Sequence, residues 1–172
     1  MRWFSLLIPN LVMLVLAYLL APVLPLFATK ENHLPKWLAF FDTPDNPIDG
    51  DGGFKEQHAP FKGEQTGWRR YINRVRWLWR NPSYGFNWTV LAYHPKAGEV
   101  ARVIYGTRKT IGGDLKLGGW YFARQGSAWQ LFINHHWNET HCCKFNFGWK
   151  LWMEAPSYTC YCPPWGLWRK YG

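Results

Sequence analysis

The feature that most limits how this chain can fold is an uncharged apolar run near its start. Residues 3–29, WFSLLIPNLVMLVLAYLLAPVLPLFAT, contain no Asp, Glu, Lys or Arg over 27 positions. A helix needs about 20 apolar residues to cross the ~30 Å hydrocarbon core of a bilayer. Trp3 and Phe27 lie near the two ends of the run, where aromatic side chains suit the membrane interface. The sequence therefore predicts a transmembrane anchor over residues 1–30.

Two other interpretations of this run stay open, a cleaved signal peptide and a buried core helix. A signal peptide has an apolar core of about 7–15 residues followed by a small-residue cleavage site. Here the run is longer, and LAPVLPLFATK offers no such site. Pro22 and Pro25 predict a kink or an end near the far side, so the span is expected to be short or tilted. The flanking positive charges lean towards a single pass with the C-terminal domain in the cytoplasm.

Residues 31–65 are rich in Pro, Gly and Asp, which is typical of a connector made of turns. Its short apolar piece, 37–41, is suited to the membrane interface. The stretch DTPDNPIDGDGG supplies four aspartates and raises the question of calcium binding. However, Pro47 and Ile48 interrupt the alternation of ligands that a calcium loop requires. We therefore predict structured turns without metal.

Residues 66–82, TGWRRYINRVRWLWRNP, form the clearest periodic segment of the chain. Apolar side chains recur at the three- and four-residue spacing of one helix face, and arginines occupy the other. Such a basic amphipathic helix is typical of a membrane surface, where arginines face anionic headgroups. A helix packed on its own domain with a solvated basic face fits equally well. The residues predicted to contact lipid headgroups or other anions are Trp68, Arg69, Arg70, Arg74, Arg76, Trp79 and Arg80.

The charge pattern bears on the class of partner. The net charge is +9, which favours an anionic partner. Seven of the eleven acidic residues lie in 31–64, and five of the ten arginines lie in 69–80. Nucleic-acid binding through the arginine helix would need stacking or base-reading groups beside the arginines. Trp77 is the one exposed candidate on that helix, so we expect membrane lipid rather than nucleic acid.

After residue 86 the period changes from that of a helix to that of strands. Runs of β-branched and aromatic residues alternate with Gly-containing turns. The predicted fold class is α+β, with an N-terminal transmembrane helix, a basic amphipathic helix and an antiparallel β-meander of five or six strands. One face of the sheet is expected to be aromatic and packed, and residues 66–172 are expected to form one aromatic-rich domain. The predicted strands lie within 86–95, 99–106, 115–124, 128–137, 144–154 and 157–165.

Histidines and cysteines gather in INHHWNETHCC, residues 133–143, and in CYC, residues 160–162. A tetrahedral zinc site needs four converging N or S donors at about 2.0–2.3 Å. The spacing is not a standard one, so three interpretations stay open: a zinc site, one or two disulfides, and free buried thiols. Zinc is the one cofactor that the sequence suggests. The candidate ligands are His135, His141, Cys142, Cys143, Cys160 and Cys162.

Catalysis has little support in the sequence. No nucleophile elbow, phosphate-binding loop, zinc-protease motif or dinucleotide fingerprint is present. A Cys–His nucleophilic pair can be written from the same cluster, but four cysteines and six histidines generate such pairs by chance. We therefore expect a non-enzymatic protein, with a metal-binding or thiol enzyme as the alternative.

Two further stretches carry a resemblance. FFDTPDNPIDGDGGF, residues 40–54, and RVRWLWRNPSYGFNW, residues 74–88, follow the hydrophobic N-terminus and precede the aromatic β half. Together they resemble an uncharacterised family of small tailed-bacteriophage proteins, most closely over residues 37–90. The resemblance implies no catalytic residue. It implies a role at the inner membrane of a bacterial host during infection, with membrane lipids and another phage or host protein as partners.

Overall fold

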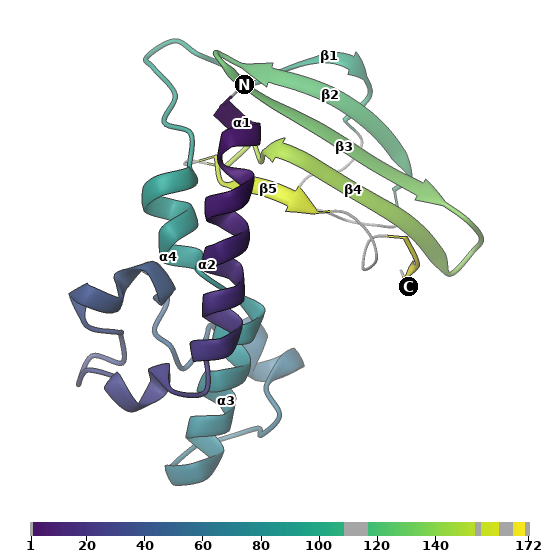
Figure 1. Cartoon of the computed structure of the whole chain (residues 1–172). Helices are drawn as coiled ribbons and strands as arrows, with labels where there is room; N and C mark the ends of the chain where they lie inside the picture. The colour runs from purple at the N-terminus through teal and green to yellow at the C-terminus, as the bar shows by residue number, and fades with distance from the viewer. Residues whose placement is uncertain (1, 109–116, 154–155, 162–166, 171–172) are drawn as a thin grey trace. The chain divides into compact units, whose positions relative to one another are not determined.

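The computed structural model describes residues 2–108, 117–153, 156–161 and 167–170, and it has helices in its first half and a sheet in its second (Figure 1). This arrangement confirms the α+β class and the antiparallel sheet. The contacts of the chain divide it into two compact units, Met1–Val90 and Leu91–Gly172. The Pro/Gly/Asp-rich segment and the basic helix both belong to the first unit, together with the apolar helix.

Helices make up the first unit. The apolar run forms α1 and α2, and α2 ends two residues before Pro22, while Pro25 occupies the first turn of η1. Proline lacks an N–H and fixes its own φ, so it is tolerated at a helix start and not in an interior. The bounds are α1 Arg2–Ser5, α2 Leu7–Leu20, η1 Leu24–Phe27, η2 Lys36–Phe41, η3 Phe54–His58, α3 Gly67–Arg80, α4 Tyr84–Phe86 and η4 Asn87–Leu91.

The core of the first unit includes the C-terminal end of the apolar helix. Ala21 and Leu24 are buried there with side chains from the turns and from α3. Trp77, expected on the exposed face of α3, is buried in this core. The full set of buried core residues is Ala21, Leu24, Leu34, Leu38, Ile48, Phe54, Ala59, Trp77 and Leu78.

Two hydrogen bonds fix α3 against the end of α2. The Trp79 indole N–H donates to the Tyr18 carbonyl at 3.0 Å, and the Tyr71 hydroxyl donates to the Pro22 carbonyl. Trp79, near the end of α3, therefore bonds to Tyr18, whereas Tyr71, near its start, bonds to the later residue Pro22. It follows that α3 runs antiparallel to the end of α2 and is fastened to it along two turns.

Residues 40–54 and 74–88 pack against each other. The Trp77 indole N–H donates to the Thr43 hydroxyl at 3.0 Å, and the Tyr84 hydroxyl donates to the Asp45 carboxylate at 3.1 Å. The Gly85 N–H donates to the Asp42 carbonyl at 2.9 Å. A Cβ at Gly85 would lie 1.9 Å from the Ala39 carbonyl oxygen, so α4 can approach η2 only with glycine here.

The second unit is built on a sheet of six strands (Figure 1). Strands β1 to β5 lie in sequence order, each antiparallel to the next, and β6 pairs with β4. This is the predicted meander. The bounds are β1 Arg102–Gly106, β2 Gly119–Gln125, β3 Ala128–His136, β4 His141–Trp149, β5 Tyr158–Tyr161 and β6 Arg169–Lys170.

The predicted strand over 86–95 is wrong. Its first part contains the last residue of α4 and the whole of η4. These helices form because Gly85 packs on η2 and the Thr89 hydroxyl donates to the Gly85 carbonyl at 2.7 Å. Packing with the rest of the chain here overrides a local preference for strand. The start of β4 also differs from the prediction, since it begins at His141 rather than at 144.

The more buried face of the sheet carries uncharged polar side chains. The Gln130 amide donates to the Asn146 carbonyl oxygen at 2.8 Å, and the Leu151 N–H donates to Gln130 at 3.2 Å. The Thr159 hydroxyl donates to the Asn146 backbone carbonyl at 3.2 Å. Phe145 and Phe147, expected on the packed face, are only half-buried. Over residues 145–148 the buried face is therefore the polar one, because these side chains bond to one another and to backbone groups, which lowers the cost of burying them. Trp149 and Leu151, on the aromatic side of the alternation, are buried.

Candidate functional site

A cluster of charges lies where α3 meets the turn after Ile48. The guanidinium groups of Arg70 and Arg74 both donate through Nε to the Asp49 carboxylate, at 2.9 and 2.6 Å. Each also donates through Nη2 to the Asn32 side-chain oxygen at 2.8 Å. Burial acts to raise the pKa of Asp49, but the hydrogen bonds and charges of the two arginines outweigh it and hold that pKa well below its usual range. The cluster thus ties the Asp-Gly turn to the basic helix.

The other predicted anion-contacting residues of α3 lie outside this cluster. Arg76 and Arg80 are exposed, and the Arg69 guanidinium lies over the Phe61 ring at 5.8 Å. Trp68 is exposed and stacks on Tyr71 with ring centroids 5.3 Å apart. Trp79 is half-buried through its bond to the apolar helix. The helix therefore presents three exposed arginines, Arg69, Arg76 and Arg80, to solvent and uses Arg70 and Arg74 to hold Asp49.

A cavity of about 360 Å³ opens beside the charge cluster. Asn73 is buried in its wall, where its amide exchanges two hydrogen bonds with the Phe61 backbone, at 2.9 and 3.1 Å. This pairing fixes the loop that includes Phe61, Gly63 and Gln65, which line the cavity. We name the space the Arg70 cavity, and its lining residues are Asp49, Lys55, Phe61, Gly63, Gln65, Arg70 and Asn73.

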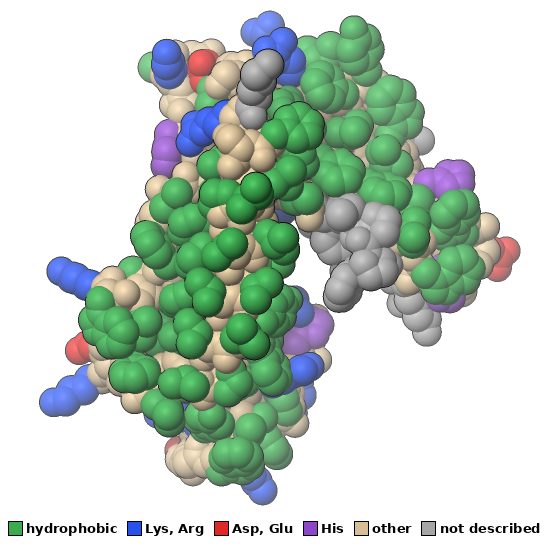
Figure 2. Space-filling model, in the orientation of Figure 1, with side chains coloured by type: hydrophobic (Ala, Val, Ile, Leu, Met, Phe, Trp, Pro, Cys, Tyr) green, Lys and Arg blue, Asp and Glu red, His purple; other side chains and the backbone are tan. Residues whose placement is uncertain are grey.

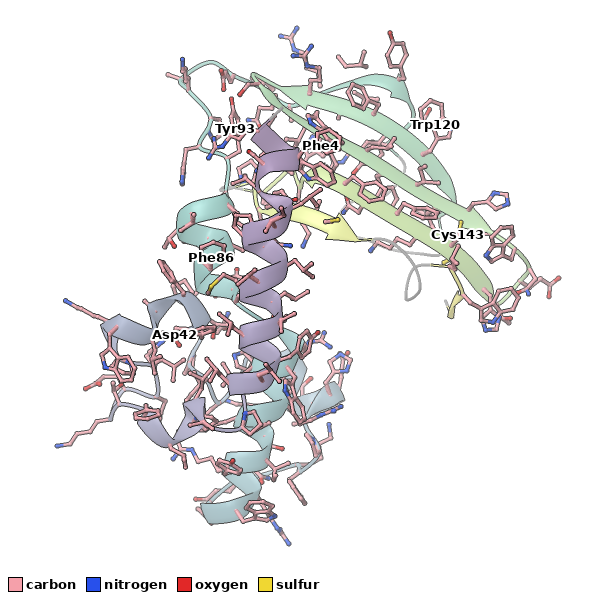
Figure 3. The ribbon with its side chains drawn as sticks, viewed as in Figure 1. Phe4, Asp42, Phe86, Tyr93, Trp120 and Cys143 are labelled. Carbon is pink, nitrogen blue, oxygen red and sulfur yellow. The ribbon has the colours of Figure 1, made fainter. Side chains whose placement is uncertain are left out.

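The aspartates of the DTPDNPIDGDGG stretch each have a protein partner of their own. The Asp42 carboxylate accepts from the Leu34 N–H at 3.3 Å and lies 3.0 Å from His33 Nδ1 (Figure 3 labels Asp42). Asp51 accepts from the Phe54 N–H at 2.6 Å. Asp45 binds Tyr84, and Asp49 binds the two arginines. The four carboxylates are thus used singly, each to fix a turn.

Sequence reasoning did not identify the walls of the Arg70 cavity. Lys55 lies in η3 and Asn73 in α3, but Phe61 and Gln65 lie in the irregular segment between these helices, where no periodicity indicates which side chains converge. One available signal was the opposite charge of 31–64 and 69–80, which favours ion pairing between the two segments. That signal predicts a contact between Asp49 and α3 but no cavity.

The structure brings part of the predicted His/Cys cluster together on β3 and β4. His135 lies directly opposite Cys143, and His136 lies opposite Cys142. Both cysteines are buried, whereas His135 is exposed, and Cys143 lies near the hairpin end of β4 (Figure 3). Residues directly opposite on antiparallel strands have Cβ atoms about 4.5–5.5 Å apart. An imidazole and a thiol are therefore neighbours on one face here.

The other predicted ligands are placed differently. Cys160 lies opposite Phe147, four residues along β4 from Cys143, which is about 13 Å at the rise of a strand. The His141 ring stacks on Trp168 with centroids 4.6 Å apart, and its Nδ1 lies 2.8 Å from the Thr140 hydroxyl. Cys162 lies outside the described residues. Across the ranges that the structure describes, no group of three His, Cys, Asp or Glu side chains is arranged to hold a metal ion.

An open cavity of about 330 Å³ lies beside the histidines. It includes the indole of Trp120, which is half-exposed (Figure 3), and the imidazoles of His135 and His136. These groups can stack on and hydrogen-bond to a ligand. Within the described residues, no hydroxyl or thiol belongs to the lining, and the two imidazoles are its titratable groups.

The N-terminal helical segment Arg2–Leu20 is long and apolar enough to cross a membrane. Only 11% of its most apolar stretch is buried. Its exposed side chains include Ile8, Leu11 and Val15, and hydrophobic side chains cover the visible face of this part of the first unit (Figure 2). A signal sequence or a buried core helix can have the same length and composition.

Comparisons with known proteins give one family. No curated protein and no solved structure matches the chain. The sequence pattern of one family, described as a family of unknown function (DUF7338), matches residues 1–166. The match begins in the apolar helix, takes in the charge cluster and the Arg70 cavity, and extends beyond β5. The chain therefore belongs to the DUF7338 family of unknown function.

Proposed function

We propose that this chain is a membrane-anchored protein whose first unit sits on the surface of the bilayer that its N-terminal helix crosses. One observation carries the proposal. The apolar helix exposes most of its length, yet its C-terminal end is built into the core of the first unit. A segment with both properties is suited to hold a folded unit directly at a membrane surface, without a flexible linker between them.

Retention of the helix is supported by what its removal would expose. Cleavage after residue 20 would remove the Tyr18 carbonyl that accepts from Trp79 and make Ala21, which is fully buried, the new terminus. Cleavage after residue 28 would also remove Leu24 from the core. A signal peptide is by contrast dispensable to the mature fold. The first unit therefore favours a retained anchor over a leader.

Exposure argues against an ordinary core helix. Large apolar side chains that face water over a whole helix are a liability in a soluble protein and mark an interaction or membrane surface. The exposed large hydrophobic residues of this segment and the turn after it are Phe4, Ile8, Leu11, Val12, Val15, Leu16, Tyr18, Leu19, Val23, Leu26 and Phe27.

An aromatic group continues the apolar surface beyond the helix. The Phe27 and Trp37 rings pack edge to face with centroids 5.4 Å apart, and both are exposed. Phe40 of η2 is exposed as well, while Lys30 and Lys36 supply positive charge beside them. Aromatic rings prefer the membrane–water interface, and lysines there face anionic headgroups. This group is suited to the depth at which the helix leaves the bilayer.

The biological setting is part of the same proposal. The resemblance of the TPDNP and RNPSYGF stretches to small tailed-phage proteins supports a bacterial inner membrane during infection. In that setting the protein crosses the membrane once, keeps its folded units in the cytoplasm, and acts as a non-enzymatic tether for a phage or host protein.

The test is a pair of matched charge substitutions in the full chain expressed in bacteria. Leu11→Glu with Val15→Glu places two carboxylates at exposed positions within α2, and each charge is expected to cost about 3 kcal/mol of insertion free energy. Val100→Glu with Tyr105→Glu is the control, since both side chains are exposed and belong to the second unit. Membranes are washed with alkaline carbonate, and hydrogen exchange reports folding of the first unit.

The proposal predicts that the wild type and the control stay in the washed membrane. The α2 variant should leave the membrane while its first unit keeps the exchange protection of α3. A wild-type chain that is soluble, or an α2 variant that remains membrane-bound, would contradict the proposal.

A further inference from the structure

We propose that the Arg70 cavity binds a phosphate ester that carries a free hydroxyl, the chemistry of a glycerol phosphate group. This group occurs both in the headgroup of an anionic phospholipid and in free glycerol phosphate. The proposal deepens the proposed function, because a headgroup site would fix the first unit on a lipid surface. It rests on the donors, the acceptor, the charge and the position of the cavity.

The cavity offers hydrogen-bond donors that the protein does not use. Arg70 commits Nε and Nη2 to Asp49 and Asn32, and its Nη1 has no partner among the residues that the structure describes. The Lys55 side chain is exposed at the rim. A guanidinium held in a fixed orientation beside an ammonium matches the oxygens of a phosphate.

One acceptor in the wall is also unused. Gln65 donates from its amide nitrogen to the Lys62 and Gly63 carbonyls, which fixes the orientation of the side chain. Its Oε1 is buried and finds no partner within the described part of the chain. A buried acceptor without a donor is costly. A ligand hydroxyl would satisfy it, which is why the proposal specifies a hydroxyl in addition to the phosphate.

The charge around the cavity favours an anion. Lys55, Arg70 and Arg74 give three positive charges, and Asp49 gives one negative charge, so the cluster carries a net +2. Asp49 stays ionised because the two arginines lower its pKa. Its carboxylate is already paired with both arginines, and two of the three cations, Lys55 and Arg70, line the cavity.

The position of the cavity relative to the apolar helix points to the headgroup layer. The helical segment Arg2–Leu20 has 19 residues, which span about 28 Å at 1.5 Å per residue, close to the ~30 Å of a hydrocarbon core. Tyr71, next to Arg70 in α3, bonds to the Pro22 carbonyl just beyond that segment. When the helix spans the bilayer, Arg70 therefore lies at the depth of the phosphates.

The experiment uses the full chain in a zwitterionic detergent and isothermal titration calorimetry. The probes are glycerol 3-phosphate, methyl phosphate and short-chain phosphatidylglycerol. Lys55→Gln removes one donor and is expected to weaken binding of all three about tenfold. Gln65→Leu removes the acceptor and is expected to weaken the two hydroxyl-bearing probes but not methyl phosphate. Lys96→Gln, an exposed lysine of the second unit, is the matched control and should leave binding unchanged.

The outcomes separate the site from the anchor. Tighter binding of phosphatidylglycerol than of glycerol 3-phosphate assigns the site to lipid, and the reverse order assigns it to the free ester. No heat with any probe, or equal binding by the wild type and by Lys55→Gln, would overturn the site. The titration does not require the helix to span a bilayer, because it is done in detergent. A negative titration therefore contradicts the phosphate site without contradicting the membrane anchor. If the chain proves soluble, which would contradict the anchor, the site can still be titrated in the same way.

Discussion

The two units of this chain both join their parts through polar side chains, but they use different chemistry. Besides neutral groups such as Asn73, the first unit uses charges: half-buried Asp49 lies between two arginines, and the buried Asp42 carboxylate lies beside His33. The second holds neutral groups: Gln130 bonds to Asn146, and Asn134 bonds to the Leu117 carbonyl. The sheet uses its amides to bond to backbone that runs past it, whereas the helical unit uses charges to fasten turns to a helix.

This difference follows from what each unit must join. Strands already satisfy their backbone groups in the ladder, so the sheet needs only neutral side-chain bonds to its loops. The first unit joins an apolar helix, a run of turns and a basic helix that share no backbone ladder. Ion pairs with good geometry give such joints a fixed orientation, at the cost of dependence on pH and salt. The predictions below test whether the two units respond as separately as this comparison implies.

The largest loss of stability is expected where two backbone segments lie so close together that only glycine fits between them. Gly85→Ala should destabilise the first unit by about 4 kcal/mol, because the added Cβ meets the Ala39 carbonyl oxygen at 1.9 Å. Gly148→Ala should do the same to the second unit, where φ is +99° and the Cβ would lie 2.0 Å from the Trp129 carbonyl oxygen. Hydrogen exchange, read separately in α3 and β3, measures each loss.

Gly52→Ala is the control for both variants, since a Cβ there meets nothing within 4 Å. Each glycine variant should reduce protection in its own unit only. Equal loss of protection in α3 and β3 would show that the units unfold together and would end the comparison.

A second prediction concerns the end of the apolar helix. Leu24 is 3% exposed, and Leu24→Ala should cost the first unit about 3 kcal/mol through the lost burial and the cavity left behind. Leu26→Ala, at a residue 70% exposed, should cost almost nothing in detergent. Thermal unfolding of the detergent-solubilised chain distinguishes them. If the two variants melt alike, the helix end is not part of the core.

A third prediction removes a charge from the first unit and places one in the second. Asp49→Asn removes the charge that Arg70 and Arg74 share and should cost the first unit about 2 kcal/mol at neutral pH. Gln130→Glu places a carboxyl on the buried face of the sheet, where burial raises its pKa above the unfolded value. Its destabilisation should therefore be present at neutral pH and fade as the pH falls and the carboxyl is protonated. Exchange protection of β3 that is independent of pH in this variant would argue against a neutral interior.

The smallest effect is expected from acid acting on the wild type. The pKa of Asp49 is lowered in the folded state, so its stabilisation is complete above the ordinary value of about 3.9 and declines as the pH falls below it. Glu99 in the second unit also has a lowered pKa, since the Tyr93 hydroxyl donates to it, but this carboxylate is exposed and counts for less. Protection of α3 should therefore fall before that of β3 between pH 4 and 2, and the opposite order would contradict the assignment of charge to the first unit.

Elements with a strong local pattern could be predicted from the sequence. The periodicity of 66–82 gave α3, and the alternating runs gave the meander from β1 to β5. The failures have a common cause in packing over long sequence distance. Residues 86–95 look like a strand, but Gly85 packs on η2 and residues 87–91 form the helix η4. Asn146 looks solvent-exposed, but Gln130 gives it a buried partner.

For the candidate site, too, features with a local sequence signal could be predicted, and features set by packing over long sequence distance could not. Opposite charges in neighbouring segments were visible, and they do meet at Asp49. The Arg70 cavity was not visible, because its walls come from a loop whose shape is set by Asn73 bonding to the Phe61 backbone. For the His/Cys cluster, only cross-strand register could show that His135 lies opposite Cys143 while Cys160 lies opposite Phe147.

The central claim is that the apolar helix is a retained anchor whose end belongs to the folded first unit. The most direct test is the intact mass of the full chain recovered from carbonate-washed bacterial membranes. The account predicts a membrane-bound protein that still contains residues 2–30. A shortened chain that begins after residue 20 and is recovered folded in the soluble fraction would contradict it.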